Sequence, residues 1–493
     1  MRKNILRLLS LILALLAISA TFFACNVTDN GNGETNALTG EQGEDEPVVR
    51  LDWGGRPFRV LATHNDYEPN FEIIGEAGAD KLAQKIFERN VFIEEYYNVE
   101  ILDVAGDDDT TFNYLEKDFM AGSKSYDLAF LIRDDMSSAI QRGFMKDITL
   151  VDYVNLENEW YNPVTINSMK ISDRLYHMSS SFSLTDKART ATLFFNRDMA
   201  TDLNLGIDVI SEVRAGTWTI DKMYQMITQV AASGDDGDGV VQNTDTFGIV
   251  GGGSECATAI YAGLGNKLVN LDAGGEDYGA GIIEDRSLLG LDTIKAMFDV
   301  YNWAGFTGSE RTLWAQDYDL PFETFVDERA LFYAASMGSI EGLAEDATFA
   351  YTAITFPKYD TDQDRYYATN DNTYSSTFGI PYMAYDVNFS GFMIEVLSWK
   401  SHTTTYPEYY QIKCMVQKSY DPVCAEMLQL NYEGLVFDFG FMFSNTVTYK
   451  KALEKYTTSK SNTKNMATLY AESKVASNDK VKGILEFIEE LPE

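Results

Sequence analysis

The chain has little positive charge. Its 493 residues include 39 Lys and Arg against 75 Asp and Glu, so the formal net charge is −36. A field this negative repels phosphate backbones and anionic lipid headgroups. We therefore expect neither nucleic-acid binding nor direct binding to a lipid surface.

Cysteine and histidine are also scarce. The four cysteines form no Cys-x-x-Cys pair, so neither a zinc ribbon nor a thioredoxin-type redox site is supported. Cys414 and Cys424 could form a disulfide in an oxidising compartment, or could both remain thiols. The three histidines (His64, His177 and His402) have no ligand-like spacing, and we interpret them as structural.

Common catalytic motifs are missing as well. The sequence contains no Gly-x-Ser-x-Gly, no Walker A loop, no Gly-x-Gly-x-x-Gly and no His-Glu-x-x-His. Among 75 carboxylates close pairs are inevitable, so a glycosidase pair cannot be inferred by counting. We predict that the protein is not an enzyme.

The N-terminus reads as an export signal. A basic start with Arg2, Lys3 and Arg7 precedes an apolar run that is shorter than the roughly 20 residues of a spanning helix. The run ends at Ala24-Cys25, which resembles a bacterial lipobox with Phe22 where Leu is usual. We predict a signal peptide over 1–24, and a lipidated Cys25 with a flexible acidic tether over 25–47. An ordinary signal peptide or an uncleaved anchor are the alternatives, and all three place the protein outside the cytoplasm.

The remaining chain can form packed cores, since 45% of the residues are hydrophobic and 13% are aromatic. Strand-like runs alternate with helical periodicity in its first part, with strands expected over 58–62, 99–104 and 126–132 and helices over 82–97 and 111–120. This order is typical of an open parallel α/β sheet, in which ligands bind beyond the carboxyl ends of the strands.

A second α/β unit is expected from about Thr192. Strand-like runs lie at 193–195, 330–333 and 349–356, with helices over 220–230 and 289–301, and the chain is mainly helical from about Tyr406. Asp421-Pro422 is a favourable helix start, because Asp can cap the helix and Pro suits its first position.

One acidic loop fits part of a calcium-binding pattern. Asp236, Asp238, Gly239 and Asp245 match positions 3, 5, 6 and 12 of a calcium loop, but position 1 falls on Gly234. The loop is either a structural calcium site or a plain acidic turn. No other metal or cofactor is expected.

Collinear segments of the chain resemble a known family. From about Val48 onward the sequence is similar to the family 1 extracellular solute-binding lipoproteins of bacterial ABC transporters, in the branch that serves sugar and oligosaccharide importers. The segments that carry the resemblance are ERNVFIEEYYNVEI (88–101), FMKDIT (144–149), RLYHM (174–178), FFNRDM (194–199), GTWTIDKM (216–223), DTFG (245–248), PKYDTDQDRYY (357–367) and CAEML (424–428).

The resemblance implies an α/β, two-lobed periplasmic-binding-protein-like (type II) fold, with interleaved lobes and a hinge of crossing strands. Lobe 1 would comprise 48–180 plus 375–410, and lobe 2 would comprise 185–365 plus 415–493. Chain crossings are expected near 179–191, near 368–378 and around Tyr410.

A sugar site needs flat apolar platforms and planar polar groups. Trp218 could equally be a packing residue, because it lies at a helix start. The candidates, taken mainly from the loops that follow strands, are Asn65, Asp66, Tyr67, Arg133, Asp134, Trp218, Trp303, Trp314, Tyr333, Met337, Asn370, Asp371 and Asn372.

The expected function is a non-enzymatic receptor, tethered to the outer face of the cell membrane through its lipid anchor alone. It would bind a carbohydrate as a monomer and deliver it to the permease subunits of an ABC importer. The alternatives are a surface-tethered glycan-degrading enzyme, and a sensory or scaffold lipoprotein that retains the fold.

Overall fold

The structure is a computed structural model. It describes residues 47–64, 72–107, 110–234, 245–272, 277–298, 303–304, 319–370, 374–415, 422–459 and 461–491; for 231–234, 303–304 and 411–415 it describes the backbone alone.

The first sheet is parallel except at one edge. Its strand order is β10-β3-β1-β2, where β1 pairs in parallel with β2 and β3, while β10 runs antiparallel to β3. The strands are β1 (Arg56–Thr63), β2 (Val99–Gly106), β3 (Leu128–Ile132) and β10 (Ser376–Gly379). The three strands expected from the apolar runs are confirmed, and β3 is buried along its whole length, as strands covered on both faces are.

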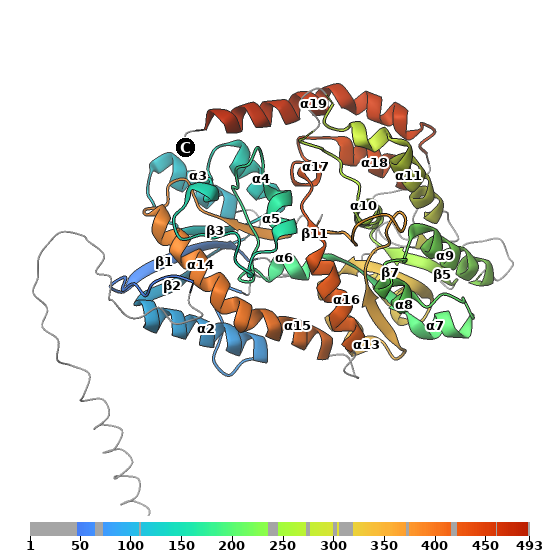
Figure 1. The fold of residues 1–493 in the computed structure, drawn as a ribbon, viewed down its shortest axis with the longest axis horizontal. Coiled ribbons are helices and arrows are strands. Elements are labelled where there is room, and N and C mark those ends of the chain that lie inside the picture. The colour runs from blue at the N-terminus through green and yellow to red at the C-terminus, as the bar shows by residue number, and fades with distance from the viewer. Residues whose placement is uncertain are drawn as a thin grey trace, which may run out of the picture.

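Helices cover both faces of this sheet (Figure 1), with α2 and α14 on one side and α3 and α4 on the other. They are α2 (Lys81–Tyr97), α3 (Thr111–Ala121), α4 (Arg133–Gln141) and α14 (Val387–Thr403). Helix α2 begins where the Asp80 carboxylate accepts a bond from the backbone N–H of Ala83 at 2.9 Å. It ends at Asn98, whose φ of 50° is a left-handed conformation that Asn tolerates.

The second sheet mixes parallel and antiparallel pairs, in the order β6-β5-β7-β4-β8. Strand β7 is parallel to β5 and antiparallel to β4. The strands of this second sheet are β4 (Ala191–Asn196), β5 (Phe247–Gly251), β6 (Trp303–Ala304), β7 (Ala330–Ser336) and β8 (Tyr351–Ile354). The helices between them are α7 (Arg197–Asp202), α8 (Val209–Arg214), α9 (Ile220–Gly234), α10 (Gly253–Gly263), α11 (Asp285–Met297), α12 (Leu320–Val326) and α13 (Ile340–Asp346).

Each sheet with its helices forms one lobe, which confirms the two-lobed α/β fold. The chain crosses between the lobes in the segment 179–190, which holds the short helix α6 (Thr185–Ala188). It crosses again at β9 (Ala368–Thr369), and a third time from α15 (Thr405–Met415) to α16 (Pro422–Glu433). The lobe boundaries themselves stay a prediction.

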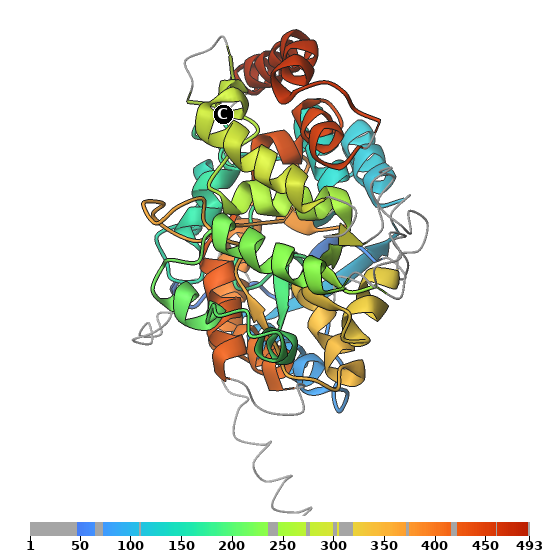
Figure 2. The ribbon, with the colours of Figure 1, turned by 90° about the vertical axis from the view of Figure 1, so that its right-hand side faces the viewer.

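The C-terminal part is mainly helical, as expected. After α16, β11 (Leu435–Val436) pairs in parallel with β9. The helices α17 (Phe439–Met442), α18 (Tyr449–Thr458) and α19 (Met466–Glu490) follow. In Figure 2, with lobe 2 facing the viewer, α19 lies at the top of the molecule. Within the described ranges, no helix has the length and apolar character needed to cross a membrane.

Aromatic side chains dominate the core of lobe 1. Phe130, at the centre of β3, is fully buried and contacts Phe182 and Phe378 at centroid distances of 5.4 and 5.1 Å. Phe182 belongs to the crossing segment, so this contact connects the sheet of lobe 1 to the first crossing.

We expect Phe130→Ala to lower the free energy of unfolding by about 3–5 kcal/mol, because it removes a buried ring and leaves a cavity. Urea unfolding followed by circular dichroism measures this loss. Met120→Ala, in which the replaced side chain is 76% exposed on α3, is the control and should leave the unfolding midpoint nearly unchanged.

Candidate functional site

The carboxyl ends of the lobe 1 strands bring several charged groups together. His64 directly follows β1, and its Nε2 lies 3.0 Å from Oδ2 of Asp103 on β2. The hydrogen bond to Asp103 raises the pKa of His64. Asp103 itself pairs with Val60 in the sheet, so the side-chain contact and not the register brings it to His64.

Arg133 and Asp134 follow the neighbouring strand β3 and begin α4. The Arg133 guanidinium is mostly buried, and its Nε donates to Oδ1 of Asp134 at 3.1 Å. Ser137 and Ser138 donate to the backbone oxygen of Asp134 and fix this first turn. The predicted residues Asn65, Asp66 and Tyr67 lie outside the described residues.

In lobe 2, two candidates lie on or directly after β7: Tyr333 is in the middle of the strand, and Met337 follows its end next to the first crossing. The backbone N–H of Met337 donates to the carbonyl of Thr190 at 2.9 Å, and the Met337 side chain is buried. Tyr333 is nearly buried beside Phe194 and Phe325, at centroid distances of 6.0 and 5.6 Å. This burial raises the pKa of Tyr333 to about 12.

Trp218 belongs to the core of lobe 2. Its side chain is 0% exposed, its indole Nε1 donates to the carbonyl of Thr355 at 3.2 Å, and its ring lies 6.0 Å from that of Phe332. The ring has no face available to a ligand in this structure. This corrects its candidacy as a sugar platform and favours the packing interpretation.

Other predicted residues are only partly described. Asn370 is buried at the second crossing, where its Nδ2 donates to the carbonyl of Asp186 at 2.5 Å. Trp314, Asp371 and Asn372 lie outside the described residues, as does Cys25, and the structure describes only the backbone of Trp303.

The calcium loop also stays a prediction. Asp236 and Asp238 lie outside the described residues, whereas Asp245 is described and nearly buried. The part of the chain that the structure describes holds no group of three or more His, Cys, Asp or Glu that could bind a metal ion. Cys424 is buried, and the Cys414 side chain is not described, so the disulfide is an open prediction.

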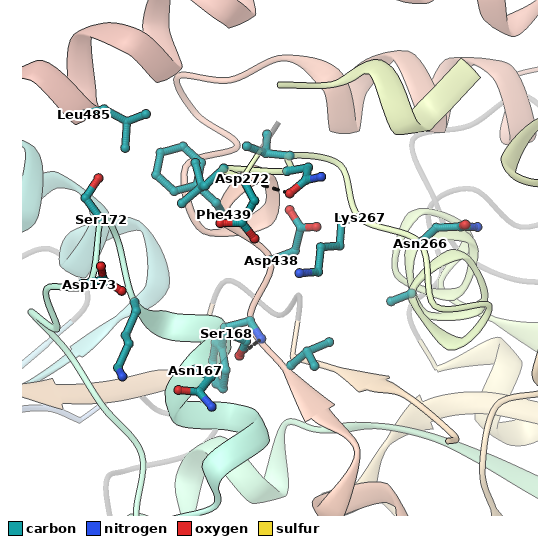
Figure 3. A pocket seen from close by; sticks show the side chains of 17 residues that line it. Asn167, Ser168, Ser172, Asp173, Asn266, Lys267, Asp272, Asp438, Phe439 and Leu485 are labelled. Atoms are coloured by element: carbon teal, nitrogen blue, oxygen red, sulfur yellow. Dashed lines mark hydrogen bonds between the residues drawn. The ribbon is translucent and has the colours of Figure 1, made fainter. Parts of the chain in front are cut away.

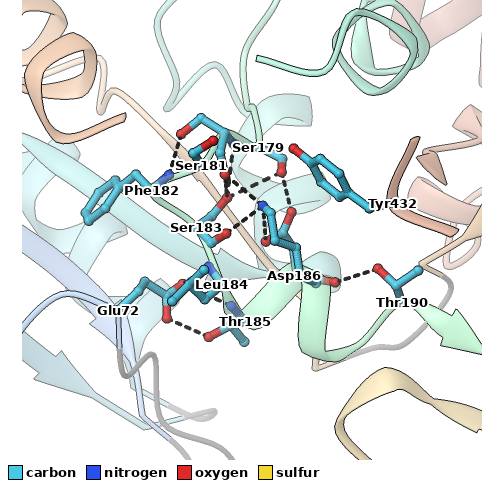
Figure 4. Close-up of polar contacts among 12 residues, drawn as sticks. Glu72, Ser179, Ser181, Phe182, Ser183, Leu184, Thr185, Asp186, Thr190 and Tyr432 are labelled. Carbon is cyan, nitrogen blue, oxygen red and sulfur yellow. Dashed lines mark hydrogen bonds and ion pairs between the residues drawn. The ribbon is translucent and has the colours of Figure 1, made fainter. Parts of the chain in front are cut away.

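A buried polar network, which the sequence did not reveal, fixes the first crossing (Figure 4). Lys187 is completely buried, and its Nζ donates to the carbonyls of Ser180 and Ser183 at 2.7 and 2.6 Å. The same ammonium group lies 3.4 Å from Oδ1 of Asp186 and 4.9 Å from the ring centre of Tyr432. Burial lowers the pKa of Lys187, while Asp186 opposes that shift.

A second pair of buried charges lies beside this network. The carboxylate of Glu72 accepts bonds from the Thr185 hydroxyl at 2.7 Å and from the Thr185 backbone N–H at 3.3 Å. Arg89 donates to the backbone oxygen of Glu72 at 2.5 Å. Burial raises the pKa of Glu72 and lowers that of Arg89 to about 9. Lys187 and Arg89 thus balance Asp186 and Glu72 where the chain leaves lobe 1.

A cavity of about 350 Å³ lies between the lobes (Figure 3). It is lined by Asn167, Ser168, Lys170, Ser172 and Asp173 from lobe 1, by Ala262, Asn266, Lys267, Val269, Asn270, Leu271 and Asp272 from lobe 2, by Val436, Phe437, Asp438 and Phe439 after α16, and by Leu485 of α19. Its volume is at the lower end of the range of small-molecule pockets. None of the candidates predicted from the sequence lines this interlobe cavity.

The interlobe cavity is separate from the carboxyl end of strand β5 in lobe 2. Helix α10 starts directly after β5, at the strand end, whereas Ala262 near its other end lines the cavity. Eleven helical residues span about 16 Å. The cavity and the carboxyl end of β5 are therefore two distinct regions.

Asp438 is the most buried charge of the cavity wall. Its Oδ2 accepts a bond from the backbone N–H of Leu268 at 2.8 Å, and its Oδ1 accepts one from that of Gly440 at 2.6 Å. Burial raises the pKa of Asp438 to about 6, although these bonds and the nearby Lys267 act in the opposite direction.

Comparison by sequence finds no relative, since no family model and no curated protein matches the chain. Solved structures do match it over most of its length. One is a cyclo/maltodextrin-binding protein in complex with maltotetraose (13% identity, TM-score 0.56), which covers 89% of this chain and 99% of its own.

Two further matches are of the same kind. The sugar-binding protein MalE from Xanthomonas citri shares 12% identity at a TM-score of 0.57 and covers 88% of this chain and 100% of its own. The other is the galacto-N-biose-/lacto-N-biose I-binding protein of an ABC transporter from Bifidobacterium longum, in complex with lacto-N-biose. It shares 11% identity at a TM-score of 0.55, and the match covers 88% of this chain and 98% of that protein. At these identities the likeness establishes the fold of the chain.

We expect Lys187→Met to destabilise the protein by about 3–5 kcal/mol, because it leaves buried Asp186 without its counter-charge. Urea unfolding at pH 7 checks this. Lys85→Met is the matched control: Lys85 forms an exposed ion pair with Glu88 on α2, so its replacement should not measurably change the midpoint. Equal midpoints for both variants would contradict the structural role of the Lys187 network.

Asp438 makes a separate prediction about pH. Because its pKa is higher in the folded protein than in the unfolded chain, the folded state binds the proton more tightly. This contribution to stability is present below about pH 4 and is lost as the pH rises through about 6. Asp438→Asn should abolish it, so the stability of the parent relative to the variant should fall between pH 4 and pH 7. Unfolding of both proteins across this range measures the difference, and a constant difference would refute the prediction.

Proposed function

We propose that the chain is a solute-binding receptor that captures a sugar or an oligosaccharide between its lobes and passes it to an ABC importer. The observation that carries the proposal is the extent of the structural likeness. Sugar-binding proteins solved with maltotetraose or lacto-N-biose superpose over nearly their whole length and over almost nine-tenths of this chain.

The strand ends support this proposal chemically. Arg133 and Asp134 provide a planar cation and a carboxylate that can bind hydroxyl groups, and His64 with Asp103 adds a second polar pair. The predicted contacts Asn65, Asp66 and Tyr67 follow His64 directly in the sequence. Crossing segments between two lobes are the arrangement that permits hinge closure on a ligand.

We extend the proposal to the location of the protein. The basic and apolar N-terminus ending at Cys25 supports export and lipidation, and 26–46 supports a polar tether. A lipid on Cys25 would hold the receptor at the membrane, where the permease subunits lie. The predicted monomer and the predicted absence of enzymatic activity belong to the same proposal, and the solved neighbours are likewise binding proteins.

Thermal unfolding of the purified chain with a broad panel of sugars and oligosaccharides tests the proposal. A ligand at 100 times its Kd adds about 2.7 kcal/mol to the stability of the folded state, so the matching sugar should raise Tm by several degrees. Calorimetry should then show stoichiometric binding, and chromatography should show the sugar unchanged. If no sugar raises Tm, the carbohydrate assignment fails, and release of new reducing ends would establish the rival glycan-degrading enzyme.

Arg133→Ala tests the location of the site. Loss of a charged hydrogen-bond donor should weaken sugar binding about tenfold or more. Thermal unfolding of the variant should remain cooperative, which shows that it is still folded. Arg142→Ala, at the exposed end of the same helix and paired with Glu116, is the control and should bind like the parent. Equal affinity of both variants would exclude the β3 end as the binding site.

A further inference from the structure

Helix α19 is long enough to reach across both lobes. Its 25 residues begin after Asn465, whose side-chain oxygen accepts a bond from the backbone N–H of Thr468 at 2.9 Å. A helix of this length measures about 37 Å. Figure 1 shows it running over the top of the molecule, from α18 of lobe 2 towards α3 and α4 of lobe 1.

The first half of α19 is fixed to lobe 2. Lys474 forms an ion pair with Asp277, with Nζ and Oδ2 2.5 Å apart. The side-chain oxygen of Asn478 accepts a bond from the Tyr449 hydroxyl at 2.8 Å and one from the backbone N–H of Tyr278 at 3.2 Å.

The end of α19 is fixed to lobe 1. Nη1 of Arg174 donates to the carbonyls of Ile488 and Leu491, at 3.0 and 3.1 Å. A guanidinium group suits a helix C-terminus, because the last carbonyls lack partners within the helix and carry partial negative charge. Beside it, Leu491 and Phe487 fill the space above Gly143, with atoms 3.2 and 3.4 Å from where a Cβ would stand.

Between these two anchors the helix passes over the interlobe cavity, and Leu485 forms part of the wall (Figure 3). The lobes are thus joined by the crossing segments, by direct contacts such as the hydrogen bond from the Thr446 hydroxyl to the side-chain oxygen of Gln141 on α4, and by a helix on the cavity side. A helix does not stretch, so a rotation of the lobes that changes the distance across the cavity must break the contacts of one anchor. The lobe 1 anchor consists of the two hydrogen bonds from Arg174 and the apolar packing of the last turn, in which Ile488 is fully buried, whereas the lobe 2 anchor includes an ion pair.

We propose that α19 is an interlobe tie, which holds the lobes at the separation seen here and releases its last turn from Arg174 when they rotate. The proposal concerns the mechanics of the fold and does not depend on the identity of the ligand.

Distance measurement between spin labels tests the tie without any ligand. Labels at Met120→Cys on α3 and Leu289→Cys on α11 occupy exposed positions on helices of different lobes. We expect the variant R174A/F487A to give a broader distance distribution than the parent, with a mean shifted by a few ångströms. The parent without added cysteines measures background labelling of its native thiols.

Arg214→Ala is the matched control, since it removes an exposed guanidinium that pairs with Glu426 at 2.6 Å within lobe 2. Its distance distribution should equal that of the parent. The tie is refuted if R174A/F487A, folded by circular dichroism, keeps the parent distribution, or if R214A broadens it equally. Should the double variant fail to fold, R174A alone decides: a smaller broadening supports the tie, and an unchanged distribution refutes it. The effect of sugars on Tm and the distance between the spin labels are measured separately, so the receptor proposal and the α19 proposal can fail independently.

Discussion

The buried ammonium group of Lys187 constrains the place where the chain leaves lobe 1. An uncompensated charge in this position would be strongly unfavourable, so the carbonyls of Ser180 and Ser183 and the carboxylate of Asp186 have to converge on it. These groups belong to one short stretch of chain, and Tyr432 and Asn370 bring the other crossings to it. One network of buried charges thus holds the three crossings together.

Much of this fold could be predicted from the sequence. The apolar runs that form β1, β2 and β3 are separated by helices with clear periodicity, and this alternation is enough to predict a parallel sheet. Strands β9, β10 and β11 could not be predicted, because they have two to four residues and Ser and Thr begin or end two of them. Their pairing is decided by tertiary contacts and by no local pattern.

The site was predictable only in part, for physical reasons. Strand ends are recognisable, so Arg133 and Asp134 could be selected before the fold was known. An aromatic residue gives no such indication, because a tryptophan is equally suited to a core and to a sugar platform, and Trp218 is fully buried. The interlobe cavity is built from four segments that lie far apart in the sequence, and their polar residues resemble those of any exposed loop.

The antiparallel edge strand of lobe 1 has a consequence for the order of folding. Strand β10 and helix α14 come late in the chain, and the Ser390 hydroxyl donates to the carbonyl of Asp127, 263 residues earlier. The sheet of lobe 1 therefore remains incomplete until the first part of lobe 2, over 185–365, has been synthesised. Contacts of such long sequence separation slow folding, and they leave the edge of β3 open in the meantime. Late closure of the first lobe would suit the export proposed above, because a translocation channel accepts an unfolded polypeptide.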